Sequence, residues 1–327
     1  MKKFFVILPD NMPLLLCGKG YYDALKSVGF FAEKSIISEL DDRAIIDYSP
    51  DCVLFFDFNE DILSLINKLR KGNKECIFIF YLTSKITTEK EKFIQNIKNK
   101  KFKRVFFTAD KENMSLFKGI NYLPIGINGK KYKADFDGYK NTVNIIANPE
   151  NEKTIKLFEY LNEFFDNISF YADENEYIKS LESSYFLGLT EETKLSYKKS
   201  YKGSLSSEKE RSKAFSESYI NIVLNDKVEN GIEYSILEVM ASGSFVFCES
   251  KSEIRRLFDV GREIETFDNF ETLLQKIEFY MRYPQIGHSI GLNARSATIN
   301  NHSAYDRVRQ IEKILKKNFL QEEKENE

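Results

Sequence analysis

Glu238 is the residue whose type and position most strongly suggest chemistry. It lies in a helix predicted over 236–241, which follows an apolar run (220–224) and a Gly-containing loop, and precedes a second apolar run (244–248). In an α/β sheet such loops lie outside the carboxyl ends of the strands, where helix N-termini attract phosphate. We expect Glu238 two to three residues inside this helix, facing the mouth of the strands. Its carboxylate would repel phosphate but can accept hydrogen bonds from both hydroxyls of a ribose.

This pattern predicts a nucleotide-sugar site. The ordinary alternative is a glutamate near a helix start that interacts with the helix dipole, an effect of only about 0.3–1 kcal/mol. The loop before the helix supplies further donor-site candidates, because backbone N–H groups at a helix start can hold a pyrophosphate. These candidates are Asn230, Gly231, Glu233 and Ser235.

Cations near this loop could neutralise a departing diphosphate, since leaving-group charge must be stabilised where it develops. Lys153 follows the first predicted strand of the second half, and Lys202 stands beside Gly203 in YKGS. Arg211, on the next predicted helix, is a third candidate. Each could equally be a solvated surface cation.

The first half offers candidates for an acceptor site. Gly18 and Gly20 fall at the expected first strand-to-helix turn, where a backbone without Cβ can approach a ligand, although a tight turn explains them equally well. Asp10 and Asn11 follow the first strand. A base is required if the reaction inverts a sugar centre, and Asp57, then Asp10, are the best-placed carboxylates. Helix caps are the commoner role for such residues.

The elements that must position these residues alternate regularly. Continuous apolar runs without period-two alternation, separated by amphipathic stretches, are typical of a parallel sheet covered on both faces. The sequence therefore predicts an α/β fold with two Rossmann-like, doubly wound halves. Expected strands include 4–8, 52–56, 77–81, 104–108, 142–147 and 168–171; expected helices include 21–28, 62–70, 89–98, 152–165, 207–217, 270–282, 285–297 and 304–319. Segment 190–201 gives no clear pattern.

Length favours two domains, since about 100–200 residues per domain is usual and the chain has 327. The polar, Gly-containing stretch 133–141 is the predicted linker. We predict an N-terminal domain (1–135), a second domain (136–302), a C-terminal helix (303–319) and a disordered tail (320–327).

Composition excludes several classes of protein. A formal charge of -2 argues against a dedicated nucleic-acid binder. The four cysteines form no C-x-x-C pair, so neither a metal knuckle nor a disulfide framework is expected. No run of about 18 apolar residues occurs, so no transmembrane segment is predicted and a cytoplasmic location is expected, with peripheral membrane contact left open. A dinucleotide oxidoreductase is disfavoured because no strand is followed by G-x-G-x-x-G.

A resemblance adds to this interpretation. The segment Leu237-Glu238-Val239-Met240-Ala241-Ser242-Gly243, with Asn221 on the preceding strand, resembles the donor-binding signature of GT-B-fold glycosyltransferases, close to the CgeB-like spore-maturation group. Phe258–Ile264 and the HSAYDR sequence at 302–307 fit the same group. The resemblance is strong over roughly residues 200–315.

The resemblance implies an N-terminal acceptor domain (1–135) and a donor domain (136–302) that face a cleft, with the C-terminal helix (303–319) packing back on the N-terminal domain. It also implies transfer of a sugar from a nucleotide-diphosphate donor to a glycan, lipid-linked or protein acceptor, without a cofactor. No metal is expected, because D-x-D occurs only in the presumed linker, at 135–137. Two positions depart from the pattern. Asn230 replaces a second glutamate, and Ser235 replaces an arginine that similar sequences carry. These departures keep open the alternative of a non-catalytic, two-lobed nucleotide-sugar-binding protein.

Overall fold

The computed structural model describes residues 2–10, 12, 14–56, 62–83, 86–116, 118–132, 138–225 and 231–319. The chain divides into two compact units. Unit 1 comprises Met1–Asn128 and His302–Glu327, and unit 2 comprises Gly129–Asn301. The predicted domains, 1–135, 136–302 and 303–319, stay predictions, because compact units are defined by contacts and not by function.

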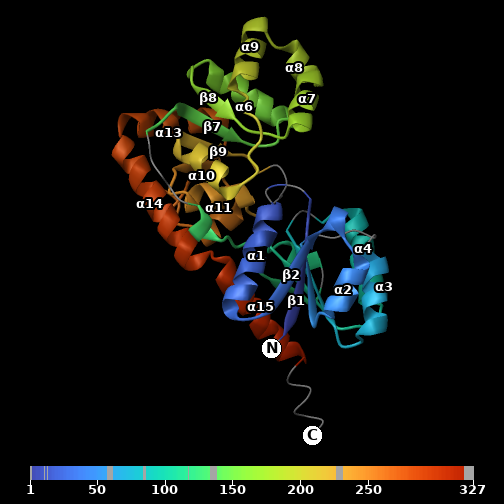
Figure 1. Cartoon of the computed structure of the whole chain (residues 1–327). Helices are drawn as coiled ribbons and strands as arrows, with labels where there is room; N and C mark the ends of the chain where they lie inside the picture. The colour runs from blue at the N-terminus through green and yellow to red at the C-terminus, as the bar shows by residue number, and fades with distance from the viewer. Residues whose placement is uncertain are drawn as a thin grey trace. The chain divides into compact units, whose positions relative to one another are not determined.

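Unit 1 is built on a parallel sheet with the strand order β2-β1-β3-β4-β5-β6 (Figure 1). The strands are β1 (Lys3–Leu8), β2 (Phe31–Ile36), β3 (Cys52–Phe56), β4 (Ile77–Leu82), β5 (Arg104–Thr108) and β6 (Ile120–Tyr122). The helices are α1 (Leu14–Val28), α2 (Asp42–Tyr48), α3 (Ile62–Gly72), α4 (Thr88–Lys98), α5 (Asn113–Leu116) and α15 (Ala304–Phe319), with 3₁₀ turn η1 (Ile37–Glu39). Strands β3 and β4 are buried along their whole length, because helices cover both faces of the sheet.

Aromatic side chains fill the core of unit 1. On one face, Phe80 stacks between Phe55 and Phe106, with ring centroids 5.3 and 5.0 Å apart, and packs with residues of α3 and α4. On the other face, Tyr21 of α1 donates a hydrogen bond to the hydroxyl of Tyr81 (3.3 Å). The two faces together bury the continuous apolar runs that the sequence shows.

Helix α15 closes unit 1 by packing along α1. The backbone N–H of Ile127 donates to the carbonyl of His302 (2.9 Å), and Arg307 Nε donates to the Pro124 carbonyl (2.7 Å). Both His302 and Arg307 are buried. The last helix therefore belongs to the N-terminal unit, in agreement with the predicted fold, in which this helix crosses back.

Unit 2 has a second parallel sheet, in the order β11-β10-β9-β7-β8. Its strands are β7 (Asn141–Ile146), β8 (Ile168–Phe170), β9 (Ser218–Val223), β10 (Val246–Glu249) and β11 (Glu265–Phe267). Its helices are α6 (Glu152–Asn162), α7 (Glu174–Glu182), α8 (Ser184–Gly188), α9 (Glu191–Ser200), α10 (Glu208–Ser216), α11 (Tyr234–Ala241), α12 (Ser252–Leu257), α13 (Phe270–Arg282) and α14 (Pro284–Asn301), with 3₁₀ turn η2 (Gly129–Lys131). Helices α7, α8 and α9 gather near the edge strand β8 (Figure 1).

The core of unit 2 joins one face of this sheet to α6 and α13. Ile220 and Ile222 of β9 belong to a buried cluster with Phe158 of α6 and Ile277 of α13. With two parallel sheets, each covered by helices, the predicted α/β class with two Rossmann-like units is confirmed.

Element boundaries differ from the expectations in three informative places. Helix α1 begins at Leu14 and not near residue 21. Its first turns include buried apolar residues and both glycines, Gly18 and Gly20, which do not interrupt the helix. Helix α11 begins at Tyr234, two residues early. The unclear segment 190–201 is helix α9, which Thr190 caps by accepting from the N–H of Thr193. Among the helices described, none combines the length and apolar character that a bilayer crossing requires.

Candidate functional site: a buried Arg–Glu–Tyr cluster beside the strand ends of unit 2

Helix α11 is the element that positions Glu238. It starts after Glu233, whose extended backbone (φ -65°, ψ 136°) ends the loop. It stops at Gly243, which has φ 75°. The N–H of Ser244 then reaches back to the Val239 carbonyl (3.2 Å), a closure that favours glycine at the left-handed position. All eight residues of α11 are buried, so the apolar sequence around Glu238 is explained by burial on every side.

Glu238 is the fifth residue of α11 and is fully buried, with 0% exposure. The expected position, two to three residues inside the helix, was therefore too shallow, because the helix starts two residues earlier than predicted. Arg211 Nε donates to Oε1 (2.6 Å), Arg211 Nη2 donates to Oε2 (2.5 Å), and the Tyr132 hydroxyl donates to Oε1 (2.8 Å). This is a bidentate guanidinium–carboxylate pair with one additional hydroxyl donor.

Arg211 reaches Glu238 because α10 begins with a capping box. The Ser207 side chain accepts from the N–H of Glu210, and the Glu210 side chain accepts from the backbone N–H of Ser207. Arg211 follows on the buried side of this helix and is 9% exposed. Its Nη2 also lies 3.5 Å from the Ser235 hydroxyl. A cation from α10 thus stands beside the position where similar sequences carry an arginine.

Tyr132 is held in place by a second arginine. Arg295 of α14 donates to the Tyr132 carbonyl (2.5 Å) and also to the Ala241 carbonyl at the end of α11. Gly129, at the start of η2, allows close packing here, because a Cβ would lie 3.3 Å from Ile299. The segment that enters unit 2 is therefore fixed against α11 and α14.

The electrostatics of this cluster favour the charged pair and the neutral phenol. Burial alone would lower the pKa of Arg211, but the carboxylate of Glu238 raises it by more, so the net pKa lies above its ordinary value. Burial, and secondly the charge of Glu238, raise the pKa of Tyr132 well above its usual range. A carboxylate can accept about four hydrogen bonds, and Arg211 and Tyr132 supply three: two to Oε1 and one to Oε2.

Other donor-site candidates lie at separate places in unit 2. Lys153, at the start of α6, pairs with Glu249 at the end of β10. Lys202 is exposed, and its Nζ donates to the Lys199 carbonyl (3.0 Å). Gly203 has φ 88°, and its carbonyl accepts from the N–H of Ala172 (3.1 Å).

Gly231, Glu233 and Ser235 are all buried next to the start of α11. They lie within seven residues of Glu238 in the chain, and their role in a donor site stays a prediction. Asn230 lies outside the described residues, and so do Asn11, Asp57 and the D-x-D at 135–137.

The two glycines of the predicted acceptor loop are not in a loop. Both belong to α1 and are buried. A Cβ on Gly18 would lie 2.5 Å from Leu8 Cδ2, and one on Gly20 would lie 3.3 Å from the Asn128 backbone nitrogen. The predicted turn at these positions is wrong, because the glycines let α1 pack closely on its protein neighbours. Asp10 is exposed and accepts from the backbone N–H of Ser38 (3.3 Å) and from its hydroxyl.

Sequence reasoning missed Tyr132 and Arg295 and ranked Arg211 low. Tyr132 stands next to the linker, and no periodicity marks it. A usable signal for Arg211 is its position four residues after the N-cap Ser207, beside the apolar Ala214 and Phe215. The polar Asn221 of the resemblance is fully buried, and its Oδ1 accepts a hydrogen bond from Asn144 Nδ2 of β7 (3.0 Å), which indicates a structural role.

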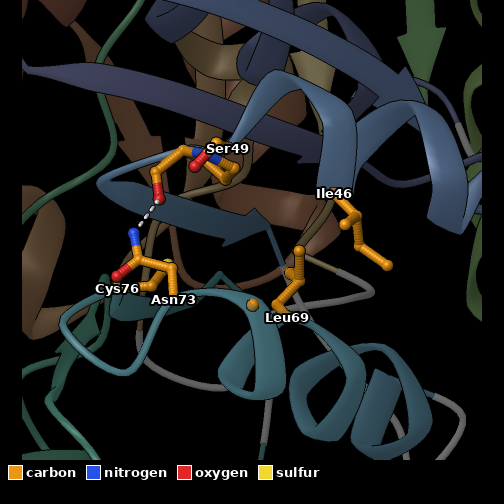
Figure 2. A pocket seen from close by; sticks show the side chains of 7 residues that line it. Ile46, Ser49, Leu69, Asn73 and Cys76 are labelled. Carbon is orange, nitrogen blue, oxygen red and sulfur yellow. Dashed lines mark hydrogen bonds between the residues drawn. The ribbon is translucent and has the colours of Figure 1, made fainter.

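A small hollow in unit 1 contains none of the predicted site residues. Its volume is about 60 Å³, and Ile46, Leu69 and Cys76 line it, with a hydrogen bond from Asn73 Nδ2 to the Pro50 carbonyl (3.2 Å; Figure 2). Sites for small molecules usually measure about 300–1,000 Å³, so this hollow is too small for a nucleotide. The described residues include no group of three or more His, Cys, Asp or Glu placed to hold a metal ion.

Comparisons with known proteins give a family match for part of the chain and a set of structures with a similar fold. Residues 191–313 match the model of a family described as "Glycosyl transferase-like". HepE from Anabaena, solved with UDP and glucose, is 12% identical, with 97% of this chain and 100% of that chain covered and a TM-score of 0.67. A glycosyltransferase from Rickettsia africae is 13% identical (97% and 98% covered, TM-score 0.65), and an alpha-glucosyltransferase in complex with UDP is 10% identical (96% and 100%, TM-score 0.66).

No curated protein matched the sequence significantly. At these identities the solved structures show a shared fold, the one found in glycosyltransferases of GT-B type. The family match covers less than half of the chain, but it includes Arg211, Glu238 and the whole of α10 and α11. This chain therefore has the GT-B fold and is similar, over residues 191–313, to the glycosyl transferase-like family.

Proposed function

We propose that the protein is a glycosyltransferase that moves a sugar from a nucleotide-diphosphate donor to an acceptor hydroxyl. The observation that carries this proposal is the buried carboxylate of Glu238 on α11, the helix that connects β9 to β10, within the segment that matches a glycosyl transferase-like family. Relatives by fold that were solved with UDP support a nucleotide donor.

Glu238 would accept hydrogen bonds from the ribose hydroxyls of the donor. Arg211 and Tyr132 fix the orientation of the carboxylate, and the ribose would use the remaining capacity of Oε2 or replace the Tyr132 hydroxyl. The backbone of Gly231, Glu233 and Ser235 at the start of α11 would lie along the diphosphate. Asn230, Lys153, Lys202 and Gly203 complete the proposed donor set.

The finer assignments are part of the same proposal. They are a hexosyl donor, a CgeB-like relationship, a role in bacterial glycan or glycoconjugate synthesis in the cytoplasm, and a reaction without metal. Asp57 and Asp10 are the proposed bases for the acceptor hydroxyl, and Asn11 is a proposed acceptor contact. Because Gly18 and Gly20 are packed inside α1, we assign them a structural role.

The test is calorimetric titration of UDP and GDP into the wild-type protein and into Glu238→Gln. Hydrogen bonds to charged groups contribute about 1.5–3 kcal/mol, so the variant should bind the preferred nucleotide about tenfold more weakly or worse. Loss of fold could mimic this result. Glu265→Gln is the matched control, because Glu265 is a buried carboxylate of unit 2 that also accepts from a lysine, Lys276, and a tyrosine, Tyr280.

Unchanged affinity in Glu238→Gln, or an equal loss in Glu265→Gln, would remove Glu238 from the site. A thermal-shift screen of nucleotide diphosphates and their sugars identifies the donor, because a ligand that binds the folded state raises its stability by mass action. The departures at Asn230 and Ser235 favour one competitor, a protein that binds the nucleotide sugar without transferring it. Such a protein would show the same affinities but release no nucleotide from the donor.

A further inference from the structure

Asn225 carries a buried amide that makes no hydrogen bond to the part of the chain that the structure describes. It follows β9 directly at the carboxyl edge of the sheet of unit 2. Both side-chain atoms, Nδ2 and Oδ1, are buried, and neither has a hydrogen-bond partner among the described residues. Buried polar groups in native proteins are almost always satisfied, so an amide with both ends unmatched calls for a partner from outside the chain.

The surroundings of Asn225 are charged and rigidly connected. Its backbone N–H donates to Glu249 Oε2 (3.0 Å), and Glu249 Oε1 pairs with Lys153 Nζ. Three separate segments, the ends of β9 and β10 and the start of α6, therefore meet at this point. Since β9 is the middle strand of the sheet and Leu224 still bonds to Ile146 of β7, Asn225 lies between the ends of β7 and β10.

The chemistry of this group selects among the parts of a nucleotide sugar. A phosphate is disfavoured, because the charge of Lys153 is already balanced by Glu249 and the carboxylate would repel an anion. A base is disfavoured, because Asn225, Glu249 and Lys153 offer no aromatic surface for stacking. Adjacent sugar hydroxyls fit, since each hydroxyl donates and accepts one hydrogen bond and the amide offers both roles beside a carboxylate that accepts.

We propose that Asn225, with Glu249 and Lys153 beside it, recognises hydroxyls of the transferred sugar and so sets the sugar specificity of the donor site. This inference rests on the proposed function, because it assigns the sugar-binding part of that same donor site. It predicts that Asn225 acts on the sugar and not on the nucleotide, which separates it from the role given to Glu238.

The experiment compares wild type, Asn225→Ala and the exposed control Asn175→Ala by calorimetry. The probes are UDP, UDP-glucose and UDP-galactose, with GDP and GDP-mannose added if guanosine is the preferred base. In Asn225→Ala, the affinity for the best sugar nucleotide should fall about tenfold or more while the affinity for the bare diphosphate stays within about twofold, because a site built to bond a hydroxyl loses its discrimination when that bond is removed. Asn175→Ala should behave like wild type.

The melting temperature of a second variant, Asn225→Leu, distinguishes a binding role of the amide from a structural role. Since the amide has no hydrogen-bond partner among the described residues, Asn225→Leu should melt at or above the wild-type temperature, whereas replacing an amide with a structural role would lower it. The inference would be overturned if Asn225→Ala lost affinity for the diphosphate and the sugar nucleotide equally, or lost affinity for neither. A clear drop in the melting temperature of Asn225→Leu would also overturn it. If the wild-type protein binds none of the probes, the proposed function itself fails. If the wild-type protein binds them and Asn225→Ala binds them equally well, only the role of Asn225 fails.

Discussion

Replacing Arg211 by methionine should destabilise unit 2 more than any surface ion-pair substitution. The change removes the guanidinium that donates two hydrogen bonds to Glu238, a carboxylate that is 0% exposed, and leaves the bond from the Tyr132 hydroxyl. Removing one partner of a buried ion pair typically costs about 3–5 kcal/mol, because the remaining charge is left uncompensated. For a unit of this size about 1 kcal/mol shifts the melting temperature by about 2–4 °C, so a drop of about 6–20 °C is expected.

The assay is urea denaturation at pH 7, followed by circular dichroism and checked by calorimetry. Lys156→Met is the matched control, because Lys156 pairs with Glu152 on the surface of α6 and such pairs contribute about 0–1 kcal/mol. The double variant Arg211→Met/Glu238→Leu should recover most of the loss, since an apolar pair of similar volume often replaces a buried ion pair without cost. Adding Tyr132→Phe should recover the remainder, because the phenol then no longer lacks an acceptor.

A cost for Arg211→Met of less than about 1 kcal/mol, equal to that of Lys156→Met, would refute this reasoning. It would show that Glu238 is accessible to water or to another cation in solution. The same result would leave the carboxylate freer to bind a ribose, so this measurement and the nucleotide titrations inform each other.

Two further predictions concern pH and packing. The folded-state pKa of Tyr132 is raised above the unfolded value of about 10, so its contribution to stability is complete below that pH and is lost as the pH rises through the folded pKa. Melting temperatures recorded from pH 8 to 11.5 should therefore fall above about pH 10, and less steeply in Tyr132→Phe; a parallel decline in both proteins would contradict this. Gly291→Ala should lose about 1–3 kcal/mol in urea denaturation, because its Cβ would lie 2.5 Å from the Gly243 carbonyl oxygen. Gly188→Ala, in a helix with no atom within 4 Å of the new methyl, is its control and should be neutral or stabilising by up to about 1 kcal/mol; similar effects of the two substitutions would refute the packing argument.

Local sequence signals located strands of unit 1 and a helix start in unit 2. The apolar runs at 52–56 and 77–81 predict strands β3 and β4 because a parallel sheet buries both of its faces. Ser207 was one of two predicted N-caps and has a capping box with Glu210, which is a relation between residues three apart. Such features are encoded within a few residues, so the sequence alone is enough to find them.

Long-range packing decided the rest. Gly18 and Gly20 suggest a turn in the sequence but lie inside α1. Their close neighbours Leu8 and Asn128 come from other segments of unit 1, so no local pattern marks this packing. An isolated helical glycine is unfavourable by about 0.5–1 kcal/mol, so only the close packing of α1 explains the pair.

From its sequence alone this chain could be assigned two parallel α/β sheets and a short apolar helix carrying Glu238, because hydrophobic periodicity, turn residues and caps act over short stretches of chain. Only the folded chain brought Arg211 and Tyr132, which lie 27 and 106 residues away, to that carboxylate, and left the amide of Asn225 without a partner among the described residues. The physical reason is that hydrogen-bond partners and burial depend on which distant segments meet, and no local pattern of residues records that meeting.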